Sequence, residues 1–195
     1  MERVDRPPDV CSWHRPSSVA AGDADAVREA SSDPAITDVT TVPTAADPGL
    51  AEEWLERQHE RAATGVGYSF AIEVDGECVG QIGLWLRERD QGRATIGYWI
   101  RPSRRRRGHA LSALQTLTEW AWSVPEIHRL QLHIDPVNDG SLRTAERAGY
   151  TREGLLRSWQ RIGHARRDMF VYSRLRGEPM TAQGRGVPGP GDPAR

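Results

Sequence analysis

The sequence has few cysteines and no long apolar run. Of its 195 residues only Cys11 and Cys78 are cysteines. They match no metal-ligand spacing, so we expect reduced thiols and no metal site. No stretch approaches the roughly 18–20 apolar residues of a membrane-spanning helix. The charged, proline-rich first ten residues lack the pattern of a signal peptide. These absences predict a cytoplasmic protein that does not enter a membrane.

Neither sign of charge is in excess. Lys and Arg number 26 against 27 Asp and Glu, a formal net charge of −1, which predicts no general attraction to nucleic acid or anionic lipid. The length and the hydrophobic content of 37% suit one globular domain. We place this domain at residues 10–175. Residues 1–9 and the Gly- and Pro-rich tail 176–195 are expected to be disordered.

The hydrophobic periodicity alternates between the helix and strand repeats along the chain. Apolar residues at helical spacing predict helices over 24–30, 48–63, 108–123 and 139–148. Shorter runs predict strands over 10–15, 68–74, 78–86, 93–100, 130–134, 150–157 and 169–175. The Asp75–Gly76 pair predicts a tight hairpin between the second and third of these strands. This order of elements predicts a mixed α/β sheet covered by helices.

The most informative segment is a strand, a basic loop and a helix in direct succession. Backbone N–H groups at a helix start have no partner inside the helix, and the helix dipole places partial positive charge there. Small residues in the loop let a diphosphate approach this backbone closely. The expected phosphate-binding residues are Arg105, Arg106, Arg107, Gly108, His109 and Ala110. Composition alone also allows a solvated basic loop or a nucleic-acid patch.

The loop resembles the acyl-CoA signature of the GNAT superfamily, Gln/Arg-x-x-Gly-x-Gly/Ala, with Arg105, Gly108 and Ala110 at its defining places. Four further segments resemble the Rim-type branch, the ribosomal-protein-alanine acetyltransferases and their relatives, and occur in that family's order: Ile96–Pro102, Asp135–Ser141, Glu146–Arg157 and Arg167–Leu175. The resemblance implies the GNAT fold, a largely antiparallel sheet splayed around an acyl-CoA cleft with helices on both faces. It also implies acetyl-CoA as co-substrate and N-acetyltransferase activity.

The resemblance also implies roles for individual residues. Trp99 and Ile100 should line the pantetheine arm, and a backbone N–H near Tyr98 should polarise the thioester carbonyl. Asn138 should bond the pantetheine amides. Ser141 should contact coenzyme A or donate a proton to the departing thiolate. Many relatives carry a tyrosine seven residues after the Asn, where this chain has Ala145, so Ser141 receives the acid role by elimination.

The general base is less clear, because relatives often carry a glutamate where this chain has Thr95. Three explanations remain open: an ordered water relays the proton, another carboxylate acts as the base, or the acceptor amine needs little help to lose its proton. An α-amino group has a pKa of about 7.7–8.0 and a lysine side chain about 10.4, a difference in deprotonation cost of about 3.4 kcal/mol. We therefore favour an α-amine or a similarly acidified amine. His109 and His133 titrate near neutrality, but an ordinary structural role is the simpler interpretation for both.

The predicted function is transfer of an acetyl group to a primary amine by direct attack in a ternary complex. A protein N-terminus, an amino acid and a small-molecule amine all remain open as acceptors, succinyl-CoA remains open as donor, and the protein could be a monomer or a homodimer. One alternative is a non-catalytic acyl-CoA sensor. Another is a ribosome- or nucleic-acid-associated module that binds through the basic loop Arg101–Arg107.

Overall fold

The computed structural model describes residues 11–12 and 21–178 of the chain. The prediction of disorder at residues 1–9 lies outside this part. So does most of the prediction for the tail, from residue 179 onward. Of the strand predicted over 10–15, only β1, Cys11–Ser12, lies within it. None of the helices in the described part is long and apolar enough to cross a membrane.

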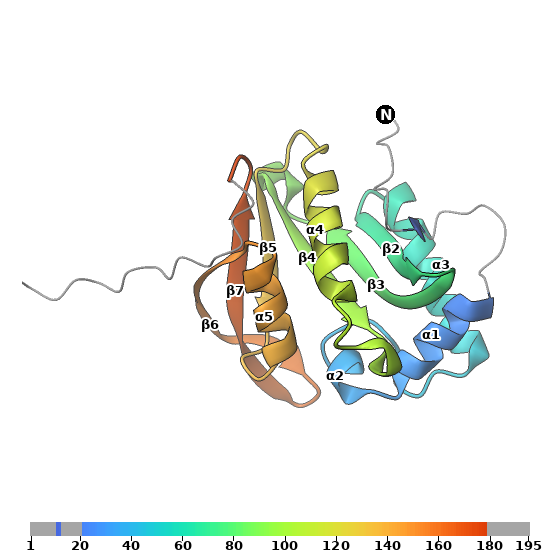
Figure 1. Ribbon diagram of the computed structural model, residues 1–195. Helices are drawn as coiled ribbons and strands as arrows, with labels where there is room; N and C mark the ends of the chain where they lie inside the picture. Colours follow the sequence, from blue (N-terminus) through green and yellow to red (C-terminus); the bar gives the residue numbers. More distant parts are fainter. Residues whose placement is uncertain (1–10, 13–20, 179–195) are drawn as a thin grey trace, which may run out of the picture.

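One sheet of seven strands, in the order β1-β2-β3-β4-β5-β7-β6, forms the centre of the molecule (Figure 1). Among the strands of the described residues, only the β4–β5 pair is parallel. This confirms the predicted mixed, largely antiparallel sheet. Beyond β1, the strands are β2 Gly67–Val74, β3 Glu77–Trp85, β4 Arg93–Ile100, β5 Arg129–Ile134, β6 Thr151–Ile162 and β7 Ala165–Leu175.

Helices cover both faces of the sheet and create two cores. On one face, α4 packs Leu114 and Leu117 onto Ile96 and Leu130. On the other, α1 and α3 enclose a second core around Trp54. The helices are α1 Ala21–Ser31, α2 Pro34–Thr37, α3 Pro48–Ala63, α4 His109–Ala121 and α5 Asp139–Arg147. The GNAT fold predicted from the resemblance is therefore confirmed.

Local signals explain the elements that were predicted well. The helix α3 has the predicted bounds, because the Asp47 side chain accepts a hydrogen bond from the Leu50 amide at 2.9 Å and Pro48 occupies the first turn. Asp75 and Gly76 both have positive φ, 53° and 78°, as the two-residue hairpin requires. Gly149 ends α5 with φ of 82°.

Two expectations were wrong in detail, and one helix was not predicted. The short helix α2 was not predicted, and α1 begins at Ala21 rather than at residue 24. The strands β6 and β7 form a hairpin that extends well beyond the predicted segments, because most of the added residues, 158–162 and 165–168, are polar and exposed and so carry no alternating pattern.

The strands β4 and β5 separate part-way along their length. Their pairing ends at Thr95 and Gln131, while β4 continues to Ile100 and β5 to Ile134. Both strands run toward the open end, and each is followed by a helix: η2 (Pro102–Arg104) and α4 after β4, and α5 after β5. The N-termini of α4 and α5 therefore flank the opening (Figure 1).

Candidate active site

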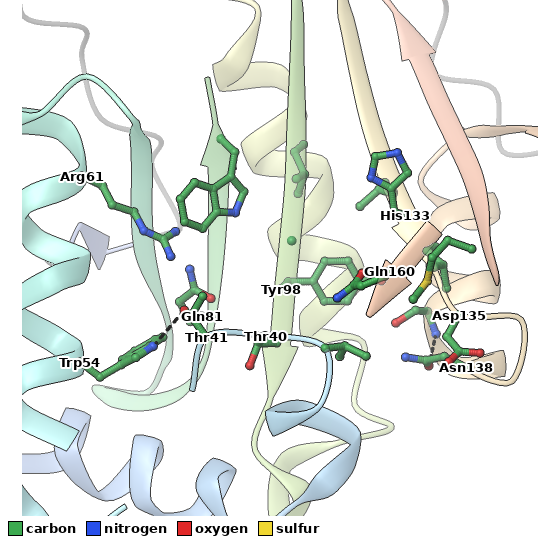
Figure 2. A pocket seen from close by; sticks show the side chains of 18 residues that line it. Thr40, Thr41, Trp54, Arg61, Gln81, Tyr98, His133, Asp135, Asn138 and Gln160 are labelled. Atoms are coloured by element: carbon green, nitrogen blue, oxygen red, sulfur yellow. Dashed lines mark hydrogen bonds between the residues drawn. The ribbon is translucent and has the colours of Figure 1, made fainter. Parts of the chain in front are cut away.

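A cavity of about 300 Å³ lies where β4 and β5 separate. Side chains alternate between the two faces of a strand, and the cavity is lined from both faces. Gly97 and His133 contribute from the α3 side, whereas Tyr98 and Ser141 contribute from the α4 and α5 side. Figure 2 shows His133 and Tyr98 among the residues around the cavity. The cavity therefore passes through the sheet between the separated strands. We call its two ends the α3-side hollow and the α5-side hollow.

The basic loop has the open backbone that a diphosphate needs. Arg106 and Gly108 both have positive φ, 63° and 85°, and α4 begins directly after Gly108. No hydrogen bond is recorded from the amides of residues 106–110 to any described part of the chain. A Cβ atom at position 108 would meet nothing within 4 Å. This geometry suits the phosphate site predicted at Arg105–Ala110.

The arginines of this loop divide into two groups. Arg101 binds the carboxylates of Glu29 and Glu77 at 2.7 and 2.9 Å, and Arg104 also pairs with Glu77. Arg105 pairs with Asp33 at 2.5 Å and donates from Nε to the Ile100 carbonyl at 3.2 Å. These three guanidinium groups hold the loop against α1, α2 and β3. Within the described residues, Arg106 and Arg107 have no recorded partner, so two exposed cations remain for a ligand.

The N-terminus of α5 presents polar groups to the α5-side hollow. The Asn138 side-chain oxygen accepts from the Ser141 amide at 3.1 Å and caps the helix. The Asn138 amide nitrogen has no recorded partner among the described residues, so it can donate to a ligand carbonyl while the oxygen caps the helix. Burial raises the pKa of Tyr98, while the neighbouring hydroxyls of Ser141 and Thr144 lower it. The Tyr98 hydroxyl is buried, with no partner at hydrogen-bonding distance in the described residues.

The two residues predicted to line the pantetheine arm are placed differently. The Arg101 amide bonds to the Val79 carbonyl on β3. By alternation, the backbone of Trp99 also faces β3, whereas the backbone of Tyr98 and Ile100 faces the gap. The Trp99 ring packs in the α3-side core, 6.1 Å from Trp54. Ile100 and Tyr98 thus offer backbone groups to the gap, and Trp99 does not.

His133 is brought to the α3-side hollow, which its sequence position alone did not indicate. It lies on β5 beyond the last residue paired with β4, and its ring centroid is 5.1 Å from that of Trp159. Burial lowers its pKa; Glu88 opposes this shift and Arg129 adds to it. Thr95 lies with His133 in an adjoining depression of about 860 Å³. The imidazole is therefore close to where a glutamate at position 95 would be.

Arg61 was missed because an arginine in the last turn of a helix normally indicates a solvated face. It is only 8% exposed and lines the α3-side hollow (Figure 2). Its guanidinium carbon lies 3.6 Å from the centre of the Trp85 ring. Only the fold shows this, because α3 and β3 are far apart in sequence.

The cleft through the sheet contains a half-buried imidazole, and the open backbone of the basic loop follows β4 at the same end of the sheet. A long thiol carrier held at the α4 and α5 N-termini can extend its end into the gap. A second reactant can approach that end from the α3-side hollow. The geometry therefore suits transfer of a group between two molecules bound on opposite faces of the sheet.

Known proteins share this sequence pattern and this fold. The sequence model of the acetyltransferase (GNAT) domain matches residues 15–151. The N-acetyltransferase p20 of Bacillus licheniformis, described as uncharacterized, is 25% identical over 158 residues, 80% of this chain and 89% of that protein. The ribosomal-protein-serine acetyltransferase of Escherichia coli is 29% identical over 117 residues, 60% of this chain and 64% of that protein.

Solved structures extend the similarity. RimJ of Mycobacterium smegmatis in complex with CoA-disulfide has a TM-score of 0.68 and 26% identity, covering 83% of this chain and 80% of that one. RimL, an alpha-N-protein acetyltransferase in complex with coenzyme A, shares the fold at a TM-score of 0.71 and 17% identity, covering 85% and 92%. Both proteins therefore share this architecture, and their structures contain coenzyme A or CoA-disulfide.

Proposed function

Because the chain belongs to the GNAT acetyltransferase family, close to its RimL and RimJ branch, and is an acetyl-CoA-dependent N-acetyltransferase, we propose that it acetylates a primary amine by direct attack in a ternary complex. The observation that carries this proposal is the cavity through the sheet. It lets the two substrates meet from opposite faces without an acyl-enzyme. Holding them together contributes up to about 7–11 kcal/mol of barrier reduction.

The donor side uses the loop and the helix start that follow β4. The amides of residues 106–110 and the cations Arg106 and Arg107 would hold the diphosphate of acetyl-CoA. Asn138 and the backbone of Ile100 would bond the pantetheine arm. A backbone N–H facing the gap, from Tyr98 or Ile100, stabilises negative charge as it develops on the carbonyl oxygen.

Proton transfer involves one group on each side of the gap. As the C–N bond forms and the C–S bond breaks, His133 accepts a proton from the amine. Ser141 supplies a proton to the departing sulfur, and the Tyr98 hydroxyl beside it supports the donor. Burial lowers the pKa of His133, so the imidazole is neutral at pH 7 and able to accept a proton.

The acceptor side favours an α-amine. The chain has Thr95 where relatives often carry a glutamate, and a low-pKa amine costs less to deprotonate. The similarity in fold to RimL, an alpha-N-protein acetyltransferase, supports the same class of acceptor. The acceptors therefore include a protein N-terminus, an amino acid and a small molecule with an acidified amine.

A thiol-release assay with acetyl-CoA and a panel of amines tests the proposal. We expect turnover with α-amines to exceed turnover with lysine side chains. Saturable coenzyme A binding without turnover on any amine would instead indicate a sensor. Binding to RNA that weakens steeply with salt, with no effect of coenzyme A, would indicate the basic-loop module. The pairing of Arg101, Arg104 and Arg105 with carboxylates argues against that module.

A further inference from the structure

The α3-side hollow contains a buried cation whose role the acetyl transfer does not explain. Arg61 is 8% exposed, and no ion pair or side-chain hydrogen bond is recorded for its guanidinium within the described residues. A guanidinium carries five N–H donors, and burying it without a hydrogen-bonding anion costs free energy. Its nitrogen atoms are not sealed off, because the side chain lines the cavity.

The residues next to Arg61 fix the position of its guanidinium but do not neutralise its positive charge. Its guanidinium stacks on the Trp85 ring at 3.6 Å, and Arg87 approaches the same ring at 4.7 Å. Gly83 leaves room for it, since a Cβ there would lie 3.0 Å from the Arg61 Nη1 atom. Burial, with a further contribution from Arg87, lowers the pKa of Arg61 to about 10. The group therefore stays charged at neutral pH.

The other charged groups around the hollows are already paired. Arg93 bonds to Glu88 at 3.0 Å, Asp135 lies 3.5 Å from Arg167, and Arg129 bonds to Glu153. Among the described residues that line the two depressions, the charges without an ion-pair partner are thus Arg61 and Arg87, both positive. The unpaired charge around the two depressions is therefore positive, which suits the binding of an anion.

From this geometry we infer that Arg61 binds a carboxylate carried by the acceptor amine. The inference rests on the proposed acetyl transfer. Arg61 lies over Gly83, directly opposite Gly97 in the register of β3 and β4, so it is about one strand spacing, roughly 5 Å, from β4, the strand that borders the gap. A carboxylate on or next to the residue that bears the amine fits this separation. Acceptors of this kind are free α-amino acids and peptides whose second residue is acidic.

Two matched pairs of acceptors test the inference and distinguish the two sources of the carboxylate. L-Alanine is compared with L-alaninamide, and the amidated peptide Ala-Glu-Ala with Ala-Gln-Ala. The alaninamide amine is less basic, so it would react faster at pH 7 if Arg61 made no difference. In one of the two pairs, we expect the acceptor that carries the carboxylate to have a kcat/KM about 10- to 100-fold higher than its neutral partner.

The variant Arg61→Gln should abolish that preference and leave the KM for acetyl-CoA unchanged. Arg61→Lys keeps the charge but not the paired donors, so it should retain part of the preference. Arg57→Gln, which removes an exposed cation one turn earlier on α3, is the matched control and should behave as the wild type. Thermal unfolding of all three variants shows whether they fold.

Other outcomes would overturn the inference without touching the acetyl transfer. Equal use of both members of each pair, unchanged in Arg61→Gln, would show that the hollow has no carboxylate site. If Arg61→Gln lost only the use of succinyl-CoA, the anion would belong to the acyl chain instead of the acceptor. If no amine were acetylated, the carboxylate site can still be tested by calorimetry of the CoA-loaded protein with N-acetylalanine and with its amide. Tighter binding of N-acetylalanine than of the amide in wild type, but not in Arg61→Gln, would support the site. Equal binding of the two compounds in wild type would exclude it.

Discussion

Gly83 of β3 and Gly97 of β4 lie directly opposite each other in the antiparallel register. Gly97 lines the α3-side hollow without a side chain, and Gly83 lies beneath the Arg61 side chain. Gly97 is exposed although it lies in a central strand, and a Cβ on it would meet nothing within 4 Å. A glycine in a strand interior weakens the strand. Its presence here is explained by the space it leaves for a reactant.

Gly97→Val should block the acceptor without harming the fold. The φ of Gly97 lies outside the left-handed region, so valine is accommodated and favours the strand. We expect kcat/KM for the amine to fall about 100-fold, because displacing a reactant by about 1 Å already has an effect of this size. The melting temperature should stay the same or rise. Gly154→Val, on β6 with similarly open space, is the control, and equal loss of activity in both variants would contradict the prediction.

Local chemistry made much of the fold predictable. The Asp47–Pro48 start of α3, the Asp75–Gly76 hairpin and the glycine that precedes α4 each act through a few neighbouring residues. The open loop before α4 was predictable for the same reason. The phosphate site proposed there depends on backbone amides at a helix start, and both the helix and the small residues are visible in the sequence.

The acceptor side was not predictable, because it depends on contacts between distant segments. The face of His133 follows from the register of β5, and its access to the hollow follows from the end of pairing at Thr95. Arg61 acquires its place only when α3 packs over Trp85. No local pattern separates such a residue from an exposed arginine. Identifying these two residues required the packing of the whole sheet.

Gly108→Glu should weaken coenzyme A binding by placing a carboxylate where the diphosphate is proposed to bind. Gly108 has φ of 85°, so any side chain adds backbone strain. Gly108→Gln carries the same strain without the charge and is the matched control. We expect the Kd of coenzyme A to rise about 10- to 100-fold more in the glutamate variant, from repulsion between charges about 5 Å apart. Isothermal titration calorimetry measures both values, and equal values would argue against a diphosphate at this loop.

Tyr98→Phe should reduce the rate without reducing stability. The Tyr98 hydroxyl is buried, with no hydrogen-bond partner among the described residues, so its removal relieves an unsatisfied group. We expect kcat to fall about tenfold and Ser141→Ala to lower it about 100-fold. The double variant should be no worse than Ser141→Ala, since both hydroxyls serve one proton transfer. Additive losses, or a lower melting temperature in Tyr98→Phe, would indicate a structural role.

His133→Asn should remove the acid limb of the pH–rate profile. Burial lowers the pKa of His133. The imidazole can therefore still accept a proton at pH values below about 6.5, the ordinary pKa of histidine. In wild type, kcat should therefore stay level near neutrality and fall only as pH drops through that lowered pKa. A hydrazide acceptor, which is uncharged across this range, keeps the titration of the amine out of the profile.

In His133→Asn the rate should be about 100-fold lower and independent of pH over the same range. His164→Asn, which changes an exposed histidine in the β6–β7 turn, should retain the wild-type profile. Glu88 and Arg129, the charges that act on His133, provide a further test. Glu88→Gln removes a negative charge that raises the pKa of His133, so it should move the acid limb to lower pH. An acid limb that survives in His133→Asn, or that Glu88→Gln leaves unmoved, would assign the proton to a different acceptor, such as a water held in the hollow.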